Sequence, residues 1–185
     1  FYKEAKKRGI HPVIGCEVYI CPDMDEKQSA AREYSHLILL CENTEGYDNL
    51  IRLVSEGFTR GFYYKPRVDY RMLEKYSGGL IALSACLSGD IPKLLLDGRE
   101  NDARQMVEKY VAIFGGDNFF IEIQDHGLAE ERQVLPRLVK LARSMTLPLV
   151  ATNDCHYLEP GDKEAQEVLM CIQTGKTLAD ENRMR

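Results

Sequence analysis

The chain has 185 residues, 44% of them hydrophobic and 29% charged, which suits one soluble globular domain with a core large enough to fold. No apolar run approaches the roughly 20 residues that a membrane span needs. The formal net charge of −5 argues against a large DNA-binding surface on this segment, because such surfaces are basic. It still allows a pocket that receives the terminal nucleotide of a strand. Six dispersed cysteines match no zinc-ribbon spacing and suit reduced, mostly buried thiols in a cytosolic protein.

Predicted helices and strands alternate along the chain. In order, the expected elements are helix 1–9, strand 11–20, strand 33–43, helix 44–58, helix 68–79, strand 80–85, helices 89–98 and 100–115, strand 117–125, helix 129–145, strand 148–154 and helix 163–175. Thr44 can cap the second helix, and Pro136 should break or kink the helix around it. The polar stretch 22–35 is the best candidate for a flexible surface loop. Strands separated by helices predict an α/β fold with a mostly parallel sheet.

Polar side chains follow three of the predicted strands. Asp154 and His156 follow the stretch 148–152 of one strand, Cys86 follows the strand 80–85, and Asp125 and His126 follow the stretch 119–124 of a third. In parallel α/β folds, chemistry gathers at the C-terminal ends of the strands. We therefore expect these side chains to share one edge of the sheet.

Two further polar residues lie within or at the start of apolar runs. Glu17 interrupts the run "PVIGCEVYI", where a carboxylate is hard to bury unless it is paired or bound to a metal. His36 opens the run "HLILL". Each residue has an ordinary explanation, because Glu17 can pair with a lysine and a strand histidine is usually hydrogen-bonded. A lone Cys86 is usually a core residue, and an Asp-x-His pair is common by chance.

The joint placement of these residues favours a metal site. Carboxylate, imidazole and thiol together form a ligand set suited to zinc, with manganese or iron as alternatives. An extended chain after the strand 148–154 would point Asp154 and His156 to one side and turn Cys155 away, so Cys155 is expected to pack rather than bind. We expect Glu17, His36, Cys86, Asp154 and His156 to converge.

Several stretches together resemble the PHP (polymerase and histidinol phosphatase) domain of bacterial replicative DNA polymerase III alpha subunits. They are "IGCEVYI", "SHLILLCENTEGYDNLIRLVS", "GFYYKPRVD", "GGLIALSACLSGDIP", "IEIQDHG", "LPLVATNDCHYL" and "VLMCIQTGKTL". The resemblance runs over nearly the whole chain, and "GFYYKPRVD" and "CIQTGKTL" are specific to the polymerase branch. The charged start, which lacks an initiator Met, predicts the inside of a longer chain.

The resemblance implies a distorted (β/α)7 barrel with up to three divalent metal ions at its C-terminal rim. Residues 1–185 would be a fragment of that domain that lacks the first strand or strands, because the family's His-x-His motif would lie upstream of Phe1. The family's ligands fall on Glu17, His36, Cys86, Asp154 and His156, and the last two are assigned as catalytic. Asp125 and His126 match a family motif of unassigned role, and they are expected to support a ligand or contact substrate.

In the family, an intact ligand set goes with metal-dependent 3′→5′ exonuclease activity that proofreads DNA synthesis. The parent chain would be a magnesium-dependent DNA polymerase in the bacterial cytoplasm. It would act on primer-template DNA and deoxynucleotides beside replicase subunits such as a sliding clamp or a proofreading exonuclease. The fragment alone is expected to be inactive and to bind metal weakly. Two alternatives stay open: a catalytically silent scaffold that docks a proofreading subunit, and a free-standing PHP phosphomonoesterase.

Overall fold

The computed structural model describes residues 1–28 and 33–183. The chain divides into two compact units, Phe1–Thr152 and Asn153–Arg185. The first unit holds the sheet and most of the helices, and the second holds a short 3-10 helix, η2 (Pro160–Asp162), and α7 (Lys163–Thr174). In the described part of the chain, no helix is both long enough and apolar enough to cross a membrane.

The described residues of the first unit form a seven-stranded sheet. Its strands are β1 (Gly15–Cys21), β2 (Ser35–Cys41), β3 (Phe62–Tyr63), β4 (Lys65–Asp69), β5 (Leu80–Leu83), β6 (Phe119–Ile123) and β7 (Leu149–Ala151), in the spatial order β3-β4-β1-β2-β5-β6-β7. Strand β1 is parallel to β4, and β5, β6 and β7 are parallel to one another. Strand β2 runs antiparallel to both of its neighbours, so its first residues lie at the edge where β1 and β5 end.

The hairpin β3–β4 was absent from the prediction. Tyr64 makes its turn in the left-handed region, with a φ of 60°. Strand β4 then pairs with β1 through Arg67, Val68 and Asp69, of which Arg67 and Asp69 are buried. A strand whose buried positions include an arginine and an aspartate carries no apolar alternation, and that is why the pattern did not reveal it.

The helices of the first unit follow the predicted order. They are α1 (Tyr2–Lys7), α2 (Thr44–Thr59), α3 (Tyr70–Lys75), α4 (Asp90–Leu96), α5 (Glu100–Phe114) and α6 (Ala129–Ser144). The cap of α2 is Asn43 rather than Thr44, since the Asn43 side chain accepts a hydrogen bond from the backbone N–H of Gly46 at 3.0 Å. Helix α6 is not broken at Pro136 but continues through it.

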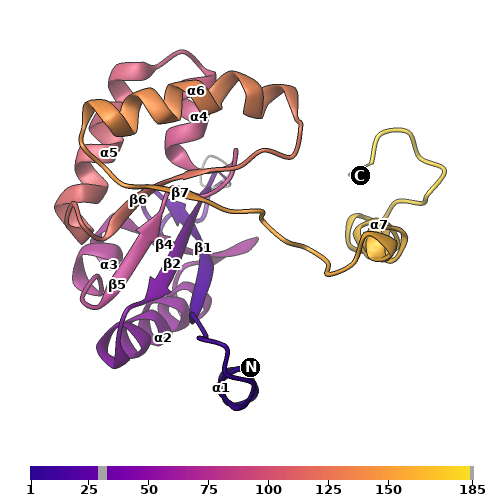
Figure 1. The fold of residues 1–185 in the computed structure, drawn as a ribbon, viewed down its shortest axis with the longest axis horizontal. Helices are drawn as coiled ribbons and strands as arrows, with labels where there is room; N and C mark the ends of the chain where they lie inside the picture. Colours follow the sequence, from indigo (N-terminus) through magenta and orange to yellow (C-terminus); the bar gives the residue numbers. More distant parts are fainter. Residues whose placement is uncertain (29–32, 184–185) are drawn as a thin grey trace. The chain divides into compact units, whose positions relative to one another are not determined.

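One face of the sheet is buried under helices. Every second side chain of a strand points to this face, such as Val18 and Ile20 of β1. These side chains pack with helical residues such as Leu53 and Tyr110 in one apolar core. Figure 1 shows α2, α3 and α5 beside the strands, and α6 contacts β6. The opposite face carries Glu17 of β1 and its neighbour His36 of β2. This mixed α/β architecture agrees with a partial (β/α) barrel of the predicted type.

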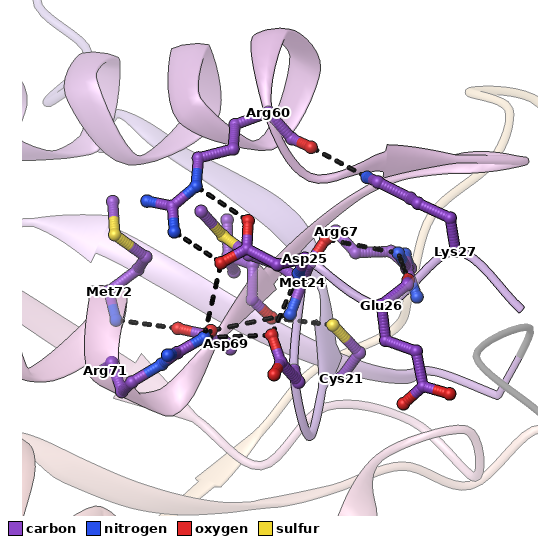
Figure 2. Close-up of polar contacts among 12 residues, drawn as sticks. Cys21, Met24, Asp25, Glu26, Lys27, Arg60, Arg67, Asp69, Arg71 and Met72 are labelled. Atoms are coloured by element: carbon purple, nitrogen blue, oxygen red, sulfur yellow. Dashed lines mark hydrogen bonds and ion pairs between the residues drawn. The ribbon is translucent and has the colours of Figure 1, made fainter.

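The segment 22–28 is anchored to the sheet, although the polar stretch 22–35 predicts a flexible loop (residues 29–32 lie outside the described part). Figure 2 shows the contacts. The guanidinium of Arg67, with 0% exposure, donates to the carbonyl oxygens of Glu26 at 2.8 Å and Met24 at 3.4 Å. Lys27 donates to the carbonyl of Arg60 at 2.7 Å, on the turn after α2. Buried charge therefore holds a segment whose composition favours disorder.

Candidate metal site at the edge of the sheet

Three of the five predicted ligands meet at the edge where β1 and β5 end. Glu17 lies on β1, His36 is the second residue of β2, and Cys86 follows β5. The Nδ1 atom of His36 is 3.3 Å from the Glu17 Oε1 atom and 3.7 Å from the Cys86 Sγ atom. The reversed direction of β2 brings His36 to this edge, because the start of an antiparallel strand lies beside the ends of its neighbours.

The surroundings of His36 favour a positive charge at its ring. Hydrogen bonds with Cys86 and Glu17 raise the pKa of His36 to about 9, against the opposing effect of burial. Aromatic neighbours fix the ring: Tyr34 is stacked on it with ring centroids 6.1 Å apart, and Tyr19 lies edge-on at 5.3 Å. The protonated ring of His36 therefore holds the two neighbouring side chains together. A metal ion bound at this ring would take the place of the proton on its nitrogen.

The donor types, a carboxylate, an imidazole and a thiol, suit a divalent metal ion of the zinc type. Ligand bonds of about 2.0–2.3 Å arranged as a tetrahedron place neighbouring donor atoms about 3.3–3.8 Å apart. The two separations around His36, 3.3 and 3.7 Å, fall in this range. Glu17 and Cys86 nevertheless approach the same ring nitrogen, and within residues 1–28 and 33–183 no three acidic, histidine or cysteine side chains are arranged as a metal-ion group.

Asp154 and His156 belong to the second unit, so their position relative to His36 stays a prediction. Strand β7 ends at Ala151, and Asp154 adopts a left-handed φ of 45° rather than continuing the strand. The His156 Nδ1 atom lies 2.7 Å from the Asp154 carbonyl oxygen and 4.0 Å from its Oδ1 atom, so the two side chains are neighbours. Cys155 is exposed, and the expectation that it packs is wrong.

Comparison with known proteins decides the family. The family model described as PHP domain matches residues 1–126. The chain belongs to the PHP domain family. A DNA polymerase III subunit alpha of Treponema pallidum is 47% identical over 188 residues, and those of Deinococcus radiodurans and Thermus aquaticus are 45% and 44% identical. Each alignment covers 100% of this chain but only 14 to 16% of the relative, so this PHP domain spans a small part of the length of those proteins.

The two rim residues of this PHP domain that follow β6 are held by local contacts. The Asp125 carboxylate accepts a hydrogen bond from the backbone N–H of Gly127 at 3.1 Å. The ring of His126 lies 2.6 Å from Glu131, which also accepts hydrogen bonds from the backbone N–H groups of His126 and Leu128. Burial raises the pKa of Glu131, but these hydrogen bonds outweigh it and lower the pKa below its ordinary value. Both residues thus shape the start of α6, and a role toward substrate stays a prediction.

One acidic residue at this face of the PHP domain, Glu122, was not predicted as a site residue. Glu122 on β6 is buried, and its backbone N–H donates to the Ser84 hydroxyl at 2.8 Å. Its signal was present, because Glu122 interrupts the apolar run "NFFIEI" as Glu17 interrupts its own run. Glu17 is exposed in the structure, so of the two carboxylates only that of Glu122 is buried and needs a partner to explain its burial.

Proposed function

We propose that this PHP domain is part of a bacterial replicative DNA polymerase and hydrolyses phosphodiester bonds at the 3′ end of DNA, using divalent metal ions. The names and similarity of the relatives support the polymerase parent. The convergence of Glu17 and Cys86 on His36 is the observation that carries the metal-dependent activity. The parent would then add nucleotides to primer-template DNA and remove misincorporated ones.

Glu17, His36 and Cys86 would hold one side of the metal centre, and Asp154 and His156 would complete it. When bound, divalent cations activate water near neutral pH and stabilise the charge that develops on a phosphoryl group. The carboxylates offset the charge of the cations, and the imidazole and thiolate favour zinc over magnesium. The aromatic rings of Tyr19 and Tyr34 keep His36 in place at the edge of the sheet.

A catalytically silent scaffold is the second candidate, and one observation favours it. Glu17, His36 and Cys86 satisfy one another by hydrogen bonding, with His36 protonated at neutral pH. These contacts pair the charged groups with one another without a cation, so the same residues would support the fold alone. A scaffold would bind other replicase subunits, such as a separate proofreading exonuclease, and would not cut DNA.

The test compares Asp154→Asn with the unmutated full-length protein, purified free of any separate exonuclease. Loss of the carboxylate charge should reduce metal-dependent removal of a mismatched 3′ nucleotide by at least about 100-fold, because it removes a direct metal ligand. Nucleotide addition should stay within a few-fold of normal. The matched control is Asp117→Asn, which changes an exposed aspartate before β6, at the opposite edge of the sheet.

The outcomes separate the two candidates. Exonuclease activity that survives unchanged in Asp154→Asn would remove this site from the reaction. An unmutated protein that adds nucleotides and binds zinc, yet never shortens a mismatched primer, would support the scaffold instead.

A further inference from the structure

Glu122 carries a buried carboxylate oxygen that finds no partner in the described part of the chain. The residue is 4% exposed, and among the described residues no hydrogen-bond partner reaches its buried Oε2 atom. An unsatisfied buried acceptor destabilises the folded state, so a native protein retains one only where something compensates. Glu122 therefore needs an explanation that the packing alone does not supply.

The strand register places Glu122 on the same face of the sheet as His36, and level with it. Ile38 of β2 pairs with Leu83 of β5, and Leu83 pairs with Phe120 of β6. His36 lies two residues from Ile38 along β2, and Glu122 lies two residues from Phe120 along β6. Both steps lead toward the edge that bears the candidate site. Since one strand separates β2 from β6, their backbones are about 10 Å apart at this level. Glu122 is thus a neighbour of the candidate metal site.

The other oxygen of Glu122 ties down the end of β7. Its Oε1 atom accepts hydrogen bonds from the Thr152 hydroxyl and from the Gln124 amide at 3.2 Å. The Gln124 amide also donates to the Thr152 hydroxyl at 3.1 Å. Thr152 is the last residue of the first unit and precedes Asp154 by two positions. Glu122 therefore fixes the point from which the chain continues to Asp154 and His156.

A small cavity is lined by both Glu122 and Cys86. It has a volume of about 10 Å³, and its polar lining comes from Cys86, Glu122, Gln124 and Glu131. This volume is close to the minimum that one water molecule occupies, and a buried water needs two or more polar partners. The lining offers them, and Cys86 also contacts His36.

We propose that Glu122 is a positioning residue of the metal site. Its free oxygen accepts a hydrogen bond from a water held in the cavity beside Cys86, and its other oxygen fixes Thr152 ahead of Asp154 and His156. Glu122 thereby orients ligands on both sides of the centre without touching the metal. This inference rests on the proposed function, because it requires that the site bind a divalent cation.

The experiment measures zinc affinity of the full-length protein by competition with a chromophoric chelator. Glu122→Gln keeps the shape but replaces one carboxylate oxygen by an amide donor, and Thr152→Val removes the hydroxyl that Glu122 fixes. Loss of an outer partner of metal ligands typically weakens affinity about 10- to 100-fold, and both variants should show such a loss. The matched control, Glu108→Gln on the exposed surface of α5, should bind zinc as the unmutated protein does.

Thermal unfolding of the zinc-free proteins separates positioning from simple structural support. Zinc affinity within about twofold of normal in both variants, combined with a lower unfolding temperature, would overturn the inference and leave the proposed function standing. An unmutated protein that binds no divalent metal would overturn both. Should Glu122→Gln fail to fold, the zinc affinity of Thr152→Val decides the question by itself.

Discussion

The substitution Arg67→Met should release the anchored segment 22–28 and destabilise the chain. The guanidinium donates to the carbonyl oxygens of Glu26 at 2.8 Å, Gly61 at 3.2 Å and Met24 at 3.4 Å, so methionine leaves three acceptors without this donor (Figure 2). The short bond from a charged donor contributes about 1.5–3 kcal/mol and the longer ones less, while removal of a buried charge offsets part of the loss. The expected net loss of unfolding free energy is about 3 kcal/mol.

Thermal unfolding followed by circular dichroism provides the assay. For a chain of this size, about 3 kcal/mol corresponds to an unfolding temperature lower by about 6–12 °C. The matched control is Arg60→Met, which removes an ion pair with Asp25 between half-exposed side chains and should have a much smaller effect. Hydrogen exchange should also become faster in residues 22–28 of the Arg67→Met chain. Equal unfolding temperatures for the two variants would refute the claim that buried Arg67 anchors the segment.

Two further predictions concern stability. Glu131→Gln should destabilise the chain most near neutral pH. The lowered folded-state pKa of Glu131 stabilises the fold above about pH 4.3, and this contribution is lost as the pH falls through the folded pKa. The urea midpoints of the variant and the unmutated chain should therefore approach each other as the pH is lowered below the unfolded-state pKa. A difference between the midpoints that is constant with pH would contradict this. Gly46→Ala should lower the unfolding free energy by more than about 2 kcal/mol, because the new Cβ atom would lie 1.8 Å from the Gly79 carbonyl oxygen. In the control Gly57→Ala, in the same helix, the new Cβ atom meets no atom nearer than 3.3 Å. This control should be close to neutral in the same denaturation assay.

Much of the candidate site could be predicted from residue type and place in the chain. Glu17, His36 and Cys86 come from three strands that follow a clear apolar pattern, and they do meet. Glu122 was not predicted, although it interrupts an apolar run as Glu17 does. The difference lies in the hydrogen-bond partners, because only the packed sheet shows that one oxygen of Glu122 has none among residues 1–28 and 33–183.

Local geometry limited the prediction beyond β7. Alternation along an extended chain placed Asp154 and His156 on one side, and their side chains are indeed neighbours. The reason differs, since Asp154 adopts a left-handed conformation that no alternation argument includes, and Cys155 is left exposed. Dihedral angles at a strand end depend on the surrounding chain as well as on the residue.

The sequence by itself determined the order of the helices and of the strands other than β3 and β4, the α/β class and the identity of the ligand candidates, because periodicity and residue chemistry are local properties. Only the tertiary structure decided the direction of β2, the hairpin β3–β4 and the anchoring of residues 22–28 by Arg67. Each of these depends on hydrogen bonds between residues distant in sequence. A backbone donor or acceptor finds its partner only once the chain has packed, and the pattern of apolar residues carries no information about which partner that is.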